Sequence, residues 1–76
     1  MPVYLYLLSQ TVNNGYDTFD SCVVTAGDEA EARLMQPADW GDLSVWAKPE
    51  DVQVRLIGIA THDEAGKVIC ASFNAG

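Results

Sequence analysis

A strand that runs directly into a capped helix start is the feature that most constrains this fold. Residues 18–26 are rich in β-branched and aromatic side chains, which favours an extended strand. Gly27 interrupts this pattern, and Asp28 together with Glu31 forms a box-like N-cap for a helix that we expect to end near Met35. A helix this short is unstable in isolation, so it must pack on a sheet.

A hairpin precedes this unit. Val3–Gln10 predicts a strand whose two faces are both apolar or aromatic. Asn13-Asn14-Gly15 favours a tight turn, because Asn and Gly tolerate positive φ. We therefore expect the first strand to pair antiparallel with residues 18–26.

Two more strands follow the helix. Val52–Ala60 alternates at first, and Gly58 marks a bulge where the alternation breaks. Lys67–Phe73 is a fourth strand after a polar turn, and these last two strands read as a second hairpin. The order β-β-α-β-β predicts a single α+β domain over residues 1–76, with one helix on a four-stranded, mainly antiparallel sheet.

One helix covers one face of such a sheet, so the second face must be solvated, covered by a loop or covered by another copy of the chain. Tyr4 and Tyr6 project to the same side of the first strand and are the expected contacts if a homodimer forms. The alternative is that both tyrosines are half-buried on a wet sheet face. Residues 36–50 form a long irregular segment in which Trp40 and Trp46 are expected to cap the core, with an aromatic contact patch as the functional alternative.

The sequence carries no recognisable catalytic, metal or cofactor motif. Cys22 and Cys70 lie in expected strands and are interpreted as packed structural thiols. A disulfide between them is the alternative, and it requires that the two strands be adjacent with matching geometry. His62 is the only histidine, and pairing it with either thiol as a nucleophile is much less favoured than a solvated turn histidine. We therefore expect no enzyme activity, no metal and no cofactor.

Charge limits the choice of partners. The chain has 11 acidic and 4 basic side chains and a net charge of −7, which disfavours direct binding to nucleic acid or anionic membrane and favours a basic partner surface. The alternative is that the charge only keeps the protein soluble, because a net charge of −7 is within the range typical of soluble small domains. No segment reads as a signal peptide or membrane span, so a cytoplasmic location is expected.

Two segments resemble small proteins encoded by phages and prophages. They are Tyr16-Asp-Thr-Phe-Asp-Ser-Cys-Val-Val-Thr-Ala-Gly-Asp-Glu-Ala-Glu-Ala-Arg33 and the tail, which comprises Val54 to Gly58 and then Val68-Ile-Cys-Ala-Ser-Phe-Asn-Ala-Gly76. The resemblance transfers no catalytic residue. It implies a phage-encoded protein in the host cytoplasm, and small acidic phage proteins of the anti-CRISPR group bind host defence complexes, in some cases by looking like DNA to a basic channel.

The leading hypothesis is thus a non-enzymatic, anti-CRISPR-type inhibitor that acts by nucleic-acid mimicry or steric blocking. Its partner is a host protein or ribonucleoprotein complex with a basic groove. The alternative is a phage accessory or structural domain that works as a homodimer. The expected partner-binding residues are Asp17, Asp20, Asp28, Glu29, Glu31, Asp39, Trp40 and Asp42.

Overall fold

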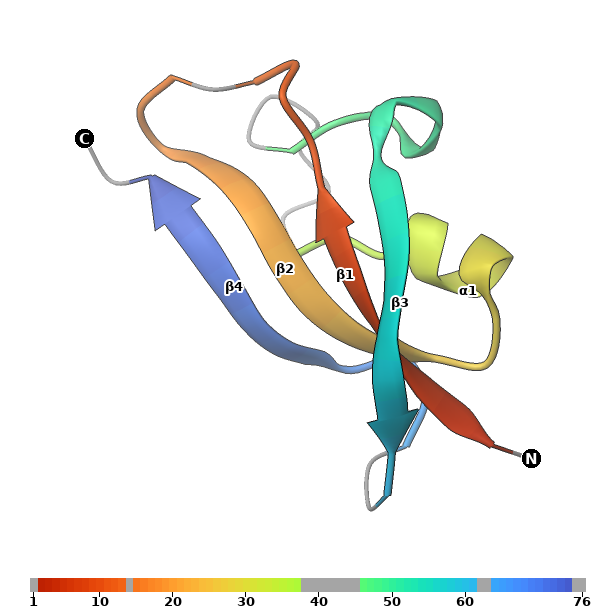
Figure 1. Ribbon diagram of the computed structural model, residues 1–76. Coiled ribbons are helices and arrows are strands. Elements are labelled where there is room, and N and C mark those ends of the chain that lie inside the picture. The colour runs from red at the N-terminus through yellow and green to blue at the C-terminus, as the bar shows by residue number, and fades with distance from the viewer. Residues whose placement is uncertain (1, 14, 38–45, 62–63, 75–76) are drawn as a thin grey trace.

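A computed structural model describes residues 2–13, 15–37, 46–61 and 64–74 of the chain. It has a four-stranded antiparallel sheet with one short helix packed on it, as the sequence predicts (Figure 1). The elements are β1 (Val3–Ser9), β2 (Thr18–Ala26), α1 (Glu29–Arg33), the 3₁₀ helix η1 (Pro49–Asp51), β3 (Gln53–Ala60) and β4 (Val68–Asn74).

The strand order is β3-β1-β2-β4, so the two hairpin strands form the centre of the sheet. β1 pairs antiparallel with β2, from Tyr4 opposite Ala26 to Ser9 opposite Ser21. The expected second hairpin is wrong: β3 pairs with β1, and β4 pairs with β2 at the other edge (Figure 1). β1 is therefore a central strand, with β2 at one of its hydrogen-bonding edges and β3 at the other.

Register shifts occur where the sequence departs from simple alternation. Between β1 and β3, Leu5 faces Gly58 and Tyr6 faces Leu56, so Ile57 is the extra residue of a bulge beside Gly58. The bulge expected at Gly58 is therefore confirmed. Leu5 packs beside Gly58 in this pairing. A Cβ placed on Gly58 would lie 3.7 Å from Leu5 Cδ1, which is an ordinary van der Waals distance.

The connection between β1 and β2 is wider than the expected tight turn, since Ser9 and Thr18 are the strand ends. The side chain of Gln10 holds it together: Nε2 donates to the carbonyls of Asn13 and Phe19, each at 2.7 Å, and Oε1 accepts from Asn13 N at 2.8 Å. Positive φ occurs at Asp17 (60°) and not at Gly15. A glutamine that supplies the turn hydrogen bonds itself removes the need for a two-residue Asn-Gly turn.

The core lies between the sheet and the segments that carry α1 and η1. We call this side of the sheet the covered face. Its central strands contribute Tyr6 and Leu8 from β1 and Cys22 and Val24 from β2, and Trp46 packs among them with 1% of its surface exposed. The expectation that Trp46 caps the core is confirmed, while Trp40 lies outside the described residues.

The crossover from β3 to β4 is fastened to the end of β2 by one threonine. Thr25 Oγ1 donates to Glu64 O at 2.6 Å and accepts from Lys67 N at 3.0 Å. The Thr25 backbone adds two bonds, to Lys67 O at 2.8 Å and from Gly66 N at 2.7 Å. Gly66 has φ of 90°, which suits glycine at this turn. Thr25 is fully buried as a result.

Replacement of this hydroxyl tests the fastening. Thr25→Val should lower the free energy of unfolding by about 1–2 kcal/mol, because the isosteric side chain keeps the packing but leaves Lys67 N and Glu64 O without their partner. Denaturant unfolding measures the loss as a lower midpoint at unchanged slope. Thr11→Val at an exposed position is the matched control and should change little. Equal stabilities of the two variants would contradict this role for Thr25.

Candidate functional site

The helix start is built as the sequence predicts. Asp28 is extended (φ −157°), and its Oδ1 accepts a hydrogen bond from Glu31 N at 2.8 Å. Glu31 Oε2 in turn accepts from Gly27 N at 2.9 Å. These two bonds form a reciprocal capping box, so the carboxylates of Asp28 and Glu31 stabilise the helix as well as contributing charge.

Arg33 joins the helix to the segment that leads into β3. Its Nη1 donates to Pro49 O at 3.1 Å and also to Val52 O. Its Nη2 lies 3.8 Å from Glu29 Oε1, one turn earlier on α1. This guanidinium therefore links α1 to η1, the element that carries Glu50 and Asp51.

We call this group the acidic helix end, and it consists of Asp28, Glu29, Glu31, Glu50 and Asp51. All five side chains are exposed, and among the described residues the Glu29–Arg33 pair is the single ion pair. Exposed pairs of this kind contribute little to stability, about 0.2–1 kcal/mol. The group therefore presents net negative charge to solvent, which is what a basic partner surface would recognise.

Glu50 and Asp51 were not among the expected contact residues. The sequence does show them as an acidic pair after Pro49, which is a signal for a solvated helix start. Their proximity to α1 depends on the hydrogen bonds from Arg33 to Pro49 O and Val52 O. These partners are 16 and 19 residues apart in the sequence, so no local pattern predicts the contacts.

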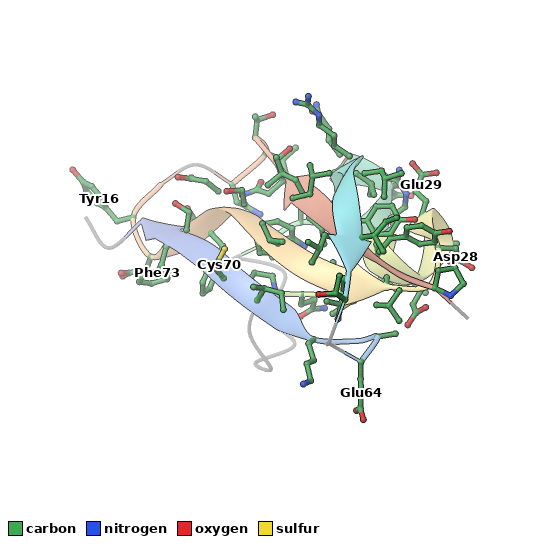
Figure 2. The ribbon with its side chains drawn as sticks, turned by 60° about the horizontal axis from the view of Figure 1, so that its bottom comes forward. Tyr16, Asp28, Glu29, Glu64, Cys70 and Phe73 are labelled. Atoms are coloured by element: carbon green, nitrogen blue, oxygen red, sulfur yellow. The ribbon has the colours of Figure 1, made fainter. Side chains whose placement is uncertain are left out.

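The other expected contact residues do not join this group. Asp17 and Asp20 are exposed near the start of β2, whereas Asp28 follows its end. A nine-residue strand spans about 30 Å, several Debye lengths at physiological salt. Figure 2 shows this separation, with Tyr16 at one end of the molecule and Asp28 and Glu29 at the other. Asp39, Trp40 and Asp42 lie outside the described residues.

The two tyrosines expected at a dimer interface lie on the covered face. Tyr6 is 7% exposed and belongs to the core, and the half-buried Tyr4 meets it edge to face with ring centroids 6.4 Å apart. Burial raises the pKa of the Tyr6 phenol, and the charges of Asp28, Tyr4 and Glu29 add to the effect. This corrects the expectation that the tyrosine-bearing face is the one left for a partner, since little of Tyr6 remains accessible.

The two thiols differ in environment. Both are free; Cys22 is buried in the core, whereas Cys70 is exposed. The expectation of two packed thiols is therefore wrong for Cys70, because β4 is an edge strand of the sheet. Burial, with a smaller contribution from Cys70, raises the pKa of the Cys22 thiol to about 12. A thiol of this kind stays protonated at neutral pH and is a poor nucleophile.

Trp46 contains the one buried side-chain polar atom in the described residues that lacks a hydrogen-bond partner, its indole Nε1. Its backbone is better held, because Asn13 Nδ2 donates to Trp46 O and so ties the β1–β2 connection to the segment that leads into η1. The residue thus fills the core at the expense of one unmade hydrogen bond.

Comparisons with known proteins add no relative: no protein family, curated protein or solved structure matches the chain. Within the described residues, no three or more His, Cys, Asp or Glu side chains are grouped so that they could hold a metal ion. The same residues contain no helix with the length and apolar character needed to cross a membrane.

The cap can be tested separately from its charge. Asp28→Ala should lower the free energy of unfolding by about 1 kcal/mol, because Glu31 N loses its acceptor, whereas Asp28→Asn should be nearly neutral since Asn caps as well as Asp. Thermal unfolding of the two variants measures the difference. Equal destabilisation by Ala and Asn would show that the charge, and not the hydrogen bond, holds the helix start.

The buried thiol predicts an alkaline limit to stability. Because the pKa of Cys22 is raised from about 9 to about 12 on folding, its contribution is intact below pH 9 and is lost as pH rises from about 9 to 12. Over that range the free energy of unfolding should fall by up to about 1.4 kcal/mol per pH unit from this group. Cys22→Ala should unfold with a shallower pH dependence, and Cys70→Ala, the matched control, should keep most of the wild-type dependence because burial is the larger cause of the raised pKa. An unchanged slope in Cys22→Ala would contradict the assignment.

Proposed function

We propose that this chain is a non-enzymatic binding protein of phage origin that inhibits a host defence complex of the anti-CRISPR target class. It binds a basic surface of that complex through its acidic helix end. The observation that supports this proposal is that α1, its N-cap and η1 carry five exposed carboxylates, and that Arg33 links α1 to η1 through hydrogen bonds to Pro49 O and Val52 O. A surface of this charge is attracted to the lysine- and arginine-lined channels that hold nucleic acid.

The charge density favours local blocking over mimicry of a continuous double helix. The molecule is 37 Å long, and duplex DNA of that length carries about 22 phosphate charges at one per 1.7 Å. The chain has 11 acidic side chains in all, and the described ones are spread over the β1–β2 connection, the start of β2, the α1 region, η1 and the β3–β4 crossover. We therefore propose that one end contacts the basic groove and that the rest of the domain obstructs it sterically.

A second candidate function is that of a phage accessory domain whose working form is a homodimer, with the acidic side chains serving solubility. It is favoured by the apolar side chains that the sheet leaves uncovered on the side opposite α1. The two candidates differ in which surface they use, and variants that change only one surface separate them.

The inhibitor proposal is tested with substitutions that remove charge and keep the capping geometry. The combined variant Asp28→Asn, Glu29→Gln, Glu31→Gln retains both hydrogen bonds of the capping box and loses three negative charges. The matched control is Asp17→Asn with Asp20→Asn at the far end of β2, where Asn tolerates the positive φ at Asp17.

The assay is the plating efficiency of a CRISPR-targeted phage on a host that expresses each variant. The wild-type chain and the far-end control should protect the phage, and the helix-end variant should lose protection as its association rate with the complex falls about tenfold or more. Surface-immobilised CRISPR complex gives the rate directly. Full protection by the helix-end variant would remove the acidic helix end from the mechanism, and absence of protection by the wild-type chain would exclude the target class.

A further inference from the structure

The sheet face opposite α1 is apolar at its centre. On β1, Val3, Leu5 and Leu7 alternate with the side chains of the covered face, and all three are half-buried. We call their side of the sheet the open face, because neither α1 nor η1 lies on it. The β3–β4 crossover covers one end of it, at Thr25, which pairs with Leu5 and is fully buried. A sheet face with apolar residues at its centre is normally buried against a second layer.

The strand register shows which residues share this face. One row across the sheet runs from Arg55 on β3 through Leu7 and Val23 to Cys70 on β4. The neighbouring row nearer the β1–β2 connection is polar, since Ser9 pairs with Ser21 of β2 and with Gln53 of β3. The open face thus has an aliphatic centre and a small polar rim, which is the usual anatomy of a protein interface.

Charge distinguishes this face from the rest of the molecule. None of the residues that the register places on it is acidic, although the chain has 11 acidic side chains. A second copy of the chain carries the same net charge of −7 and is repelled wherever carboxylates face each other. The centre of the open face therefore lets two copies approach without facing carboxylates. Arg55 is the charged residue in its register, and the exposed Glu64 lies at the end where the crossover meets Thr25.

The size of the face matches a modest interface. Four strands spaced about 4.8 Å apart, each with about seven residues rising 3.3 Å, give a planar area of about 440 Å² per copy. A typical stable interface buries about 800 Å² of accessible surface per partner, and weak encounters bury less. Pairing of two open faces is therefore expected to be reversible and dependent on concentration.

We propose that two copies of the chain pack open face to open face around a two-fold axis, with Leu5, Leu7 and Val23 at the centre of the contact. The product is a two-layered sandwich of sheets, in which each layer covers the aliphatic centre of the other. The acidic helix end of each copy, on the covered side of its sheet, then points away from the partner and stays accessible.

The first test is sedimentation velocity across the micromolar to millimolar range. Wild type should shift from one to two chain masses, and Leu7→Glu should remain a monomer because it places a carboxylate at the centre of the face. The matched control is Ile59→Glu, on an exposed side chain (65%) that pairs with Tyr4 on the other side of the sheet. This variant should dimerise as wild type does. Far-UV circular dichroism at low concentration checks that each variant is folded.

The second test needs no substitution. Cys70 ends the row of Leu7 and Val23 and is exposed, while Cys22 is buried, so iodoacetamide at neutral pH reports on Cys70 alone. Its alkylation should slow as the dimer fraction rises. A chain that remains monomeric at millimolar concentration, or a dimer that persists in Leu7→Glu or leaves the Cys70 rate unchanged, would overturn the proposal. A persistent dimer of that kind would point to the strand edges or the covered face instead.

Discussion

The antiparallel pairing of β1 with β2 is the interaction on which the rest of this structure depends. Each outer strand is attached to one of these two and to no other strand of the described sheet. Most of the core comes from their covered face, where Leu8 and Val24 are fully buried. Gln10 and Thr25 act at opposite ends of the pair, one closing the β1–β2 connection and the other fastening the crossover into β4. The short helix contributes a lid, and its own stability depends on this support.

Local chemistry predicted the parts of the fold that depend on a few adjacent residues. The alternation and β-branching of Thr18–Ala26, the Asp28 cap and the bulge beside Gly58 are all formed as expected. A large indole in a chain with so small a core was also expected to be buried, and Trp46 is.

Contacts between residues far apart in the sequence could not be predicted in the same way. The polar turn before β4 is compatible with a hairpin, yet β4 pairs with β2, because the edge of β2 and the hydrogen bonds of Thr25 offer it a better neighbour than β3. The exposure of Cys70 follows from that edge position and not from its sequence context. The gathering of Glu50 and Asp51 with α1 likewise depends on Arg33 reaching across the chain, a contact that periodicity does not encode.

The acidic side chains of the helix start both cap the helix and carry negative charge, so a substitution can affect folding and binding together. Asp28 and Glu31 accept hydrogen bonds from backbone N–H groups. A charge reversal at either position therefore removes a capping bond as well as a negative charge, and its effect on binding cannot be separated from its effect on the helix. Glu29 has a weaker structural role, through one exposed ion pair with Arg33. Neutral isosteres separate the two effects, because Asn and Gln keep the acceptor oxygen and remove the charge.

The acidic helix end and the open face lie on opposite sides of the sheet and differ in chemistry. The first is charged, and the second is aliphatic at its centre. The covered side carries the helix and its carboxylates, and repulsion between these groups opposes an approach of two copies from that side. The open face lacks carboxylates at its register positions and has aliphatic side chains at its centre. A dimer formed through the open face would therefore double the number of acidic helix ends without masking either. Two linked ends raise the effective concentration of the second contact once the first has bound a basic target. In that arrangement a weak interface between copies strengthens binding to an extended basic groove more than a further carboxylate on a single copy does.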